Sequence, residues 1–277
     1  MFIGVDLGGT NIRAGLSDKG VITSVNQALL IEKDSVQKTI SQLISIIAPL
    51  VSPAVKGIGI GVPSVVDVDN GIVFDVVNIS SWKRVELKSI LEAEFKIPVR
   101  INNDVNCFAL GEHIYGQGKS FSSLVALALG TGLGAGVIVN NALYCGKNCG
   151  AGEIGSLPYL DSNFEFYASS SFFESRFSTS AFQAHEDALG GNADALQVWD
   201  EYGHHLGNVL KAVVYTYDPE AIILGGSISK AYNFFEASMK QAMADFLFPE
   251  TLKKLKIIRS KTPNIALLGA AALVNNV

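Results

Sequence analysis

The sequence has few cysteines and no long apolar run, and these two scarcities exclude several classes of protein. Only three of the 277 residues are cysteines, Cys107, Cys145 and Cys149, which is too few for a disulfide framework. Cys145 and Cys149 have no further Cys or His nearby to complete a zinc site, so we expect free thiols in a reducing cytoplasm. The longest apolar stretch, 124–139, contains four glycines and is shorter than the roughly 20 residues that a membrane helix needs.

Runs of basic residues are missing as well. The formal net charge is -5, and no Lys/Arg-rich segment is present that would favour a nucleic-acid partner. Residues 1–10 lack a basic start and carry Asp6 inside their apolar run, so we expect no signal peptide. These features predict a cytoplasmic protein without a membrane or nucleic-acid partner. The hydrophobic content of 48% is enough for the cores of two domains.

A GxxxxGK[ST] phosphate loop is absent, but Gly-rich turns occur at three other places. In the first, Asp6 precedes Gly8, Gly9 and Thr10 between two predicted strands. Glycine lets a phosphate approach the backbone closely, and threonine offers a hydroxyl. Asp6 cannot bind a phosphate directly, so its sensible role is to hold Mg²⁺ through water. Taken alone, this turn is equally typical of an ordinary hairpin.

The other two Gly-rich turns strengthen the case for a nucleotide. Gly130, Gly132 and Ala135 match a loose dinucleotide fingerprint, but the following residues 137–139 predict a strand and not the helix that this motif requires. Gly225, Gly226 and Ser227 follow a predicted strand, where open α/β sheets bind ligands, although a plain strand-to-helix turn is the alternative. Three such turns in one chain favour nucleotide binding.

The chain alternates between predicted strands and helices in two similar halves. Residues 2–16 and 124–139 both read as strand, Gly/Thr turn and strand, which indicates an internal duplication. Asp34 is the expected N-cap of a helix over 36–47, and residues 116–120 are the expected hinge. We predict an N-terminal lobe over 1–116, a C-terminal lobe over 117–263, and a C-terminal helix over 264–277 that packs back on the first lobe.

The motifs together resemble those of a known superfamily. Its two phosphate motifs and its adenosine motif are similar to Asp6-Leu7-Gly8-Gly9-Thr10, Leu129-Gly130-Thr131-Gly132 and Gly225-Gly226-Ser227. The superfamily is that of actin, hexokinase and Hsp70. Within it, the chain resembles the ROK family of bacterial sugar kinases and sugar-responsive repressors through GVPSVVD (61–67), NISSW (78–82), INNDVNC (101–107) and GAGEIGS (150–156). The likeness covers nearly the whole chain in the family's order.

This resemblance implies an α/β fold with two ribonuclease-H-like (actin-like ATPase) lobes that close on a sugar in a central cleft. It also implies ATP, Mg²⁺, transfer of the γ-phosphoryl group to a hexose hydroxyl, and commonly a homodimer. Repressors of the family carry an additional N-terminal DNA-binding helix-turn-helix. This chain begins directly at the phosphate motif, so we expect a kinase.

The resemblance assigns roles to individual residues. Asp104 is the expected general base, since it follows a strand at the edge of the cleft, where a carboxylate can accept the hydroxyl proton. The alternative is that Asn103 or Asp104 only caps the next helix. The expected sugar-binding residues are Asn78, Asn103, Asp104, Glu153 and Glu165, with Ser64 near the sugar. The expected nucleotide-binding residues are Asp6, Gly8, Gly9, Thr10, Asn11, Gly130, Thr131, Gly132, Gly225, Gly226 and Ser227, and Asp6 also holds the Mg²⁺.

One departure from the family pattern leaves the sugar open. Ser156 stands where the family's GExGH motif has its His, and a shortened loop, LPYLDSNF, replaces the cysteine-rich zinc loop before Glu165. We therefore expect no structural zinc. Ser64 also replaces a glycine that is frequent in the family. Phosphorylation of glucose at its 6-hydroxyl is the first expectation, with an N-acetylglucosamine, N-acetylmannosamine or fructose kinase next.

Two further alternatives are a non-catalytic sugar sensor and an acetate-kinase-like or chaperone-like ATPase, although the latter should lack the INND and GEIG pair. The four histidines, His113, His185, His204 and His205, lie outside all of these motifs and are assigned no role.

Overall fold

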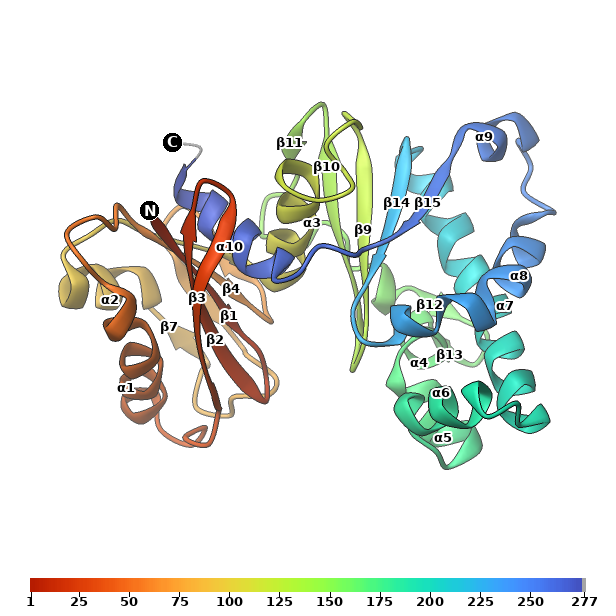
Figure 1. The fold of residues 1–277 in the computed structure, drawn as a ribbon, viewed down its shortest axis with the longest axis horizontal. Coiled ribbons are helices and arrows are strands. Elements are labelled where there is room, and N and C mark those ends of the chain that lie inside the picture. Colours follow the sequence, from red (N-terminus) through yellow and green to blue (C-terminus); the bar gives the residue numbers. More distant parts are fainter. Residues whose placement is uncertain (276–277) are drawn as a thin grey trace. The chain divides into compact units, whose positions relative to one another are not determined.

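The computed structural model describes residues 1–275, and the chain divides into two compact units (Figure 1). Unit 1 consists of Met1–Ser120, Gly136–Ala151 and the C-terminal segment from Lys261, and unit 2 consists of Phe121–Ala135 and Gly152–Ser260. The sequence predicted that 136–151 belongs to the C-terminal lobe. The structure instead assigns this segment to unit 1, because Gly136 lies against Val105 and Ala109 so closely that a Cβ would come within 2.6 Å of them.

A five-stranded sheet with the order β3-β2-β1-β4-β8 forms the centre of unit 1. Its strands are β1 (Phe2–Leu7), β2 (Asn11–Asp18), β3 (Val21–Leu29), β4 (Ile58–Val62) and β8 (Val99–Asn103). Strands β1, β4 and β8 run parallel, and their register places Asp6 beside Gly61 and Gly61 beside Asn102. We call the carboxyl ends of these three strands the carboxyl edge of the unit 1 sheet.

Four helices accompany this sheet: α1 (Val36–Ile47), α2 (Leu87–Phe95), α3 (Asp104–Ile114) and α10 (Ile265–Asn275). Helix α10 packs on β1, β4 and α3. A Cβ on Gly4 would lie 1.8 Å from the Leu267 carbonyl oxygen, so only glycine permits so close an approach. The helix predicted over 264–277 corresponds to α10, and residues 276–277 lie outside the described part. Ser35, and not Asp34, caps α1, because its hydroxyl accepts the Lys38 N–H at 3.4 Å.

Two smaller groups of strands complete unit 1. Strands β5 (Val66–Asp67), β6 (Ile72–Phe74) and β7 (Arg84–Val85) form a separate three-stranded sheet. The later residues of β10 (Leu133–Val139) pair with β11 (Ala142–Leu143) in a hairpin.

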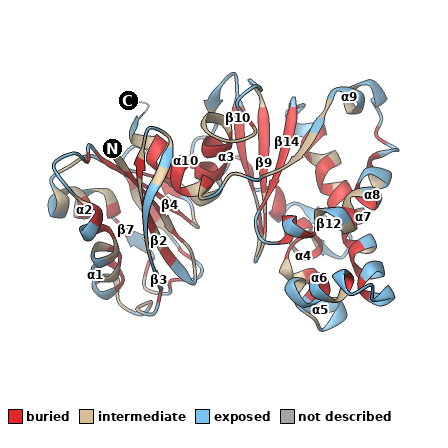
Figure 2. Ribbon diagram, in the orientation of Figure 1, coloured by how far each residue is buried: buried red, intermediate tan, exposed pale blue. Residues whose placement is uncertain are grey.

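Unit 2 has a parallel core of β9 (Leu124–Leu129), β14 (Ala221–Gly225) and β15 (Lys256–Arg259), with β14 in the middle. The first three residues of β10 follow at the outer side of β9. Strands β9 and β14 are almost fully buried (Figure 2). The short elements before the helices are β12 (Pro158–Tyr159) and β13 (Ser162–Asn163). The helices are α4 (Phe164–Ala168), α5 (Ser170–Phe177), α6 (Ala181–Leu189), α7 (Ala193–Tyr217), α8 (Tyr232–Met243) and α9 (Pro249–Lys254).

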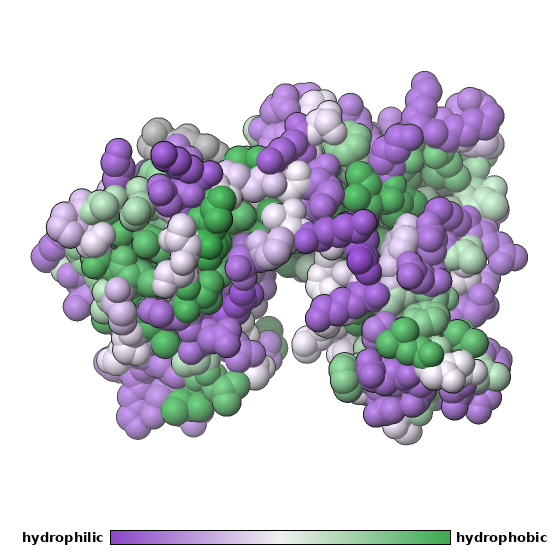
Figure 3. All heavy atoms as spheres, in the orientation of Figure 1, coloured by the Kyte–Doolittle hydropathy of each residue, from purple (hydrophilic) through white to green (hydrophobic). Residues whose placement is uncertain are grey.

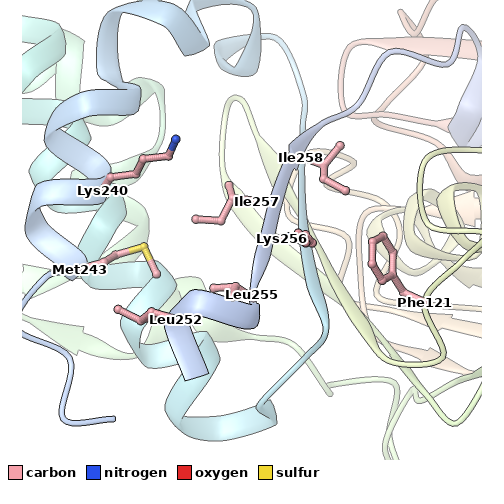
Figure 4. A pocket seen from close by; sticks show the side chains of 8 residues that line it. All are labelled: Phe121, Lys240, Met243, Leu252, Leu255, Lys256, Ile257 and Ile258. Atoms are coloured by element: carbon pink, nitrogen blue, oxygen red, sulfur yellow. The ribbon is translucent and has the colours of Figure 1, made fainter. Parts of the chain in front are cut away.

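The surface of unit 2 offers two apolar features apart from the candidate site residues. Apolar side chains gather over α5 and α6 on the face shown in Figure 3, where Phe177, Phe182 and Leu189 are exposed. A pocket of about 520 Å³ lies among α8, α9 and β15 (Figure 4). None of the expected site residues lines it. No helix within residues 1–275 is long and apolar enough to cross a membrane.

Candidate functional site

The first Gly-rich turn connects β1 to β2 at the carboxyl edge of the unit 1 sheet. The Gly8 N–H donates to the Asn11 carbonyl at 2.9 Å and closes the turn. Gly9 lies directly against the Asn78 side chain, since a Cβ on Gly9 would come within 2.6 to 2.8 Å of three Asn78 atoms. The structure therefore joins an expected phosphate turn to an expected sugar-binding amide. Thr10, Asn11 and Asn78 are exposed and accessible to a ligand.

Asp6 occupies the last part of β1, next to this turn, in surroundings that suit a cation. Burial raises the pKa of the Asp6 carboxyl, and the positive charge of Arg13 only partly offsets this effect. A buried carboxylate is costly unless positive charge compensates it. Within residues 1–275 no group of three or more His, Cys, Asp or Glu side chains could hold a metal by itself. Asp6 thus fits a hydrated ion that takes its other ligands from phosphates, as Mg²⁺ usually does.

Asn103 and Asp104 lie where β8 ends and α3 begins, and both side chains accept backbone N–H groups of the helix. The Asn103 side-chain oxygen caps α3, because it accepts the backbone N–H groups of Val105 at 2.8 Å and Asn106 at 3.2 Å. Asp104 is the first residue of the helix, and its carboxylate also accepts the Val105 N–H at 2.9 Å. The amino end of a helix favours the ionised form of a carboxylate. Asn103 therefore caps α3, and Asp104 follows it in the first turn of the helix.

Further contacts hold this segment in place. The Asn103 amide donates to the Ser64 carbonyl at 3.4 Å, while the Ser64 hydroxyl donates to the Phe74 carbonyl. Burial and the negative charges of Asp104 and Asp6 raise the pKa of the Cys107 thiol, so both carboxylates lie near that side chain. Ser64, Asn103, Asp104 and Asp6 consequently gather at one edge of unit 1. Ser64 uses its hydroxyl within the protein.

The second Gly-rich turn joins β9 to β10 in unit 2. The Gly130 N–H donates to the Gly132 carbonyl at 3.0 Å, and Ser170 holds the turn from α5 through its own N–H, which donates to the Gly130 carbonyl at 2.8 Å. Thr131 is exposed. The Glu165 carboxylate accepts the Leu133 N–H at 3.0 Å. An expected sugar-binding acid therefore supports an expected phosphate turn.

Glu153 lies close to Glu165. A Cβ on Gly155 would come within 2.3 Å of the Leu133 carbonyl oxygen and 3.4 Å of the Glu165 side chain, so the GAGEIG segment runs tightly along the start of β10. Glu153 is exposed as a residue, but nearby protein atoms exclude part of the water around its carboxyl and thereby raise its pKa. The negative charge of Glu165 raises this pKa further. Unit 2 thus presents a pair of carboxyl groups that can accept hydrogen bonds from a polyhydroxyl ligand.

The third Gly-rich turn adjoins the second. Gly225 pairs with Ala128 across the parallel strands β14 and β9. Gly226 has a φ of +82°, and a Cβ there would lie 2.2 Å from the Leu129 carbonyl oxygen, so this position requires glycine. Ser227 is exposed, and its hydroxyl oxygen lies 3.8 Å from the position that a Cβ on Gly130 would occupy. Unit 2 brings these two turns together.

The shortened loop before Glu165 is stabilised by contacts that sequence reasoning missed. Tyr159 stacks on Phe164 with ring centroids 4.6 Å apart, and its hydroxyl lies 3.1 Å from His205 Nδ1. Asn208 donates to the same hydroxyl at 3.1 Å. Asn163 caps α4 by accepting the Phe166 N–H at 2.8 Å, and this places Glu165 in the first turn of α4. His205 is 46 residues away from Tyr159 in the sequence, and no local sequence pattern predicts their contact.

The whole chain is similar to several known proteins. A glucokinase of Thermotoga maritima is 28% identical over an alignment of 307 residues, which covers 98% of this chain and 96% of that protein. A xylose repressor of Bacillus spizizenii is 29% identical over 298 residues, which cover 98% of this chain and 76% of the repressor. The crystal structure of a ROK family glucokinase from Streptomyces griseus, in complex with glucose and AMPPNP, has a TM-score of 0.85 at 24% identity and covers 100% of this chain. It covers 99% of that glucokinase.

The last similarity confirms the predicted fold class, which is α/β with two actin-like units. The characteristic sequence of the ROK family matches residues 2–277. Because this match extends over almost the entire chain, the protein belongs to the ROK family.

Proposed function

We propose that the protein is an ATP-dependent sugar kinase that transfers the γ-phosphoryl group to a hexose hydroxyl, with Asp104 as the general base. The observation that carries this proposal is the position of Asp104 in the first turn of α3, on the same sheet edge as Asp6. A carboxylate held in this way can accept the proton of an attacking hydroxyl. The similarity to a glucokinase of Thermotoga maritima supports the same reaction.

Each unit contributes its own groups to the proposed reaction. In unit 1, the turn of Gly8, Gly9 and Thr10, continued by Asn11, binds phosphate, and Asn78 and Asn103 bind the sugar, with Ser64 near it. In unit 2, Gly130, Thr131 and Gly132 bind phosphate, Gly225, Gly226 and Ser227 bind adenosine, and Glu153 and Glu165 bind sugar hydroxyls. Asp6 is the residue that would hold Mg²⁺ through water, and the ion supplies positive charge to the phosphates.

Asp104 acts as the sugar oxygen attacks the γ-phosphorus and the bond to the leaving ADP oxygen breaks. Its carboxylate accepts the hydroxyl proton, while backbone N–H groups in the two phosphate turns stabilise the charge on the transferring group. Glucose, phosphorylated at its 6-hydroxyl, is the substrate we propose first, because two carboxylates and two amides suit a ligand with several hydroxyls. N-acetylglucosamine, N-acetylmannosamine and fructose are the next candidates.

The proposal is tested by measuring ADP release from Mg-ATP with a panel of free hexoses and N-acetylhexosamines. We expect turnover with one sugar and a loss of roughly 100- to 10,000-fold in kcat in Asp104→Asn, with sugar affinity retained. Chelation of Mg²⁺ should abolish turnover, and Asp6→Asn should raise the Mg²⁺ concentration required. Near-normal kcat in Asp104→Asn would contradict the assignment of the base. Light scattering on the purified protein tests the expected homodimer.

A second candidate function is a sugar sensor without catalysis. The similarity to a xylose repressor of Bacillus spizizenii and the loss of the motif His at Ser156 favour it. If calorimetry detects binding of a sugar while no sugar of the panel causes ADP release, the sensor is the correct function. ATP turnover that does not depend on sugar would instead select an ATPase of the same superfamily.

A further inference from the structure

Two cysteine side chains meet in unit 1, and the proposed phosphoryl transfer uses neither. Cys145 follows β11 and is half-buried, whereas Cys149 is buried. The short loop between them is closed by the Ala151 N–H, which donates to the Cys145 carbonyl at 3.1 Å. Cys145 Sγ lies 3.7 Å and Cys149 Sγ 3.3 Å from the same atom, Asn102 Oδ1. The two thiols therefore lie at one side-chain oxygen.

Both thiols also contact Asn102, the residue that precedes Asn103 and Asp104. Cys149 Sγ donates to Asn102 Oδ1 at 3.3 Å, and Asn102 Nδ2 donates to Cys145 Sγ at 3.4 Å. The same Asn102 oxygen accepts the backbone N–H of Asn103 at 2.8 Å. Asn102 is only 3% exposed, so water cannot readily replace these partners. One side chain thus links the thiol pair to the cap of α3.

We propose that Cys145 and Cys149 are a redox modification site, at which a peroxide converts the two thiols into a reversible disulfide that alters the Asn102–Asp104 segment. The effect on sugar turnover rests on the proposed kinase function. Formation of the disulfide does not, because it depends only on the geometry of the thiol pair and Asn102.

The pKa values of the two thiols are shifted in opposite directions, so that one thiol can attack the peroxide while the other stays protonated. The neighbouring Cys149 thiol and the Asn102 amide, which donates to Cys145 Sγ, lower the pKa of Cys145 to about 7, so a large share of Cys145 is thiolate at neutral pH. The neighbouring Cys145 thiol and burial raise the pKa of Cys149, which stays protonated. A thiolate with a pKa near the ambient pH is the better nucleophile toward peroxide.

The chemistry balances with hydrogen peroxide as the oxidant. The Cys145 thiolate attacks one peroxide oxygen, the O–O bond breaks, and Cys145 becomes a sulfenic acid as water leaves after protonation. The Cys149 sulfur then attacks the Cys145 sulfur, its proton goes to the departing hydroxide, and a second water leaves. Two thiols and one peroxide give one disulfide and two waters. A dithiol reductant reverses the change by thiol–disulfide exchange.

Oxidation would remove the thiol proton that Cys149 donates to Asn102. The two sulfur atoms, which now lie at Asn102 Oδ1, would also move to a bond of about 2.05 Å from each other. Asn102 Oδ1 would then lose one donor while still accepting the Asn103 N–H. Because small displacements of catalytic groups are costly, we expect kcat/KM to fall on the order of tenfold or more in the oxidised protein.

Cys107 supplies an internal control. It is 1% exposed, and burial together with the nearby negative charges of Asp104 and Asp6 raises the pKa of its thiol. It should therefore stay reduced under conditions that oxidise Cys145.

The experiment treats the purified full-length protein with limiting hydrogen peroxide, alkylates it under denaturing conditions and maps its peptides by mass spectrometry. We expect two of the three thiols to be lost, a linked peptide that contains Cys145 and Cys149, and full recovery with dithiothreitol. Cys149→Ser should stop at a sulfenic acid on Cys145 that dimedone traps, and Cys145→Ser should keep its remaining thiols reduced. Three free thiols, or a disulfide that includes Cys107, at a peroxide dose that oxidises glutathione would overturn the proposal.

Failure of this inference and failure of the kinase assignment remain distinguishable. Peptide mapping and the thermal midpoint of the oxidised protein need no sugar turnover. If the protein shows no sugar turnover but forms the disulfide reversibly, the redox site is supported and the kinase assignment is refuted. A protein that phosphorylates a sugar but keeps all thiols free retains the kinase and loses the redox site. In an active protein, the Cys145→Ser, Cys149→Ser double variant should keep its turnover after peroxide.

Discussion

The Glu165 carboxylate accepts the backbone N–H of Leu133 at 3.0 Å, and this bond ties the start of α4 to the end of the Gly130–Gly132 turn. A residue expected to bind sugar thereby supports a turn expected to bind phosphate within the same unit. Charge-assisted hydrogen bonds of this kind are stronger than neutral ones. Glu165 is exposed, so its second oxygen stays accessible to a ligand while the first positions the turn.

Substitution of Gly132 by Ala should disturb both functions of Glu165 at once. The new Cβ would lie 2.6 Å from Glu165 Oε2, so the carboxylate must move away from the Leu133 N–H. Loss of a bond worth about 1.5–3 kcal/mol should raise KM for both ATP and sugar roughly tenfold. Steady-state kinetics measure this effect. Gly150→Ala is the control, since a Cβ there meets nothing within 4 Å, and equal KM values in the two variants would refute the coupling.

Two substitutions at Asn103 should separate capping from sugar binding. Asn103→Ala removes the oxygen that caps α3, so the free energy of unfolding should fall by about 1 kcal/mol. Asn103→Asp keeps a capping oxygen but loses the amide that donates to Ser64, so it should remain near the wild-type stability. If the amide binds sugar, both variants should raise KM for the sugar. Thermal melts measure the contribution of Asn103 to stability, and steady-state kinetics measure the KM for the sugar. A normal sugar KM in Asn103→Asp would show that Asn103 caps α3 and does not bind the sugar.

The sequence indicated the residues whose roles depend on neighbours in the chain. Asp6 with its glycines, and Asn103 with Asp104, stand where a strand ends, and strand ends can be inferred from apolar runs. Contacts across long separations could not be inferred in this way. Asn102 meets Cys145 43 residues later, and Tyr159 meets His205 46 residues later. The assignment of 136–151 to unit 1 likewise depends on the close packing of Gly136 against α3, which no local pattern encodes.

His205 should make the stability of unit 2 depend on pH. Burial lowers the pKa of His205, and the neighbouring Glu201 carboxylate opposes this effect. In the unfolded chain a histidine gains its proton near pH 6.5, whereas in the folded protein His205 gains it at a lower pH. Between these two values the unfolded state binds more protons. The free energy of unfolding should therefore fall as the pH drops below about 6.5, by at most about 1.4 kcal/mol per pH unit.

Urea unfolding at pH 7.5 and pH 5.5 tests this dependence. The loss of stability on acidification should be smaller in His205→Gln than in the wild type, because glutamine does not titrate. His204→Gln is the matched control on the next residue of α7, and His204 is 42% exposed in its side chain. An equal loss in the wild type and in His205→Gln would show that His205 contributes nothing to the dependence.

The pair of Glu153 and Glu165 should set the pH at which sugar affinity declines. Partial burial of the Glu153 carboxyl, and then the negative charge of Glu165, raise the pKa of Glu153 above that of an ordinary glutamate. Only the ionised carboxylate accepts hydrogen bonds from sugar hydroxyls with both oxygens. As the pH falls, Glu153 therefore gains its proton earlier than an isolated glutamate would, and sugar affinity should decrease in the same range. Glu153→Gln should bind sugar more weakly, with little change in affinity between pH 7 and pH 5.

Glu165→Gln distinguishes this coupling from a general effect of acid. Removal of the Glu165 charge lowers the pKa of Glu153, so the decline in sugar affinity should move to a lower pH even if overall affinity also falls. Calorimetric titration with glucose between pH 5 and pH 7.5 measures the midpoint of the decline. Glu174→Gln removes the same charge from an exposed position of α5 and should leave the midpoint unchanged. If sugar affinity declines at the same pH in Glu165→Gln, in Glu174→Gln and in the wild type, then Glu165 does not control the ionisation of Glu153. Another group then sets the pH dependence of sugar binding.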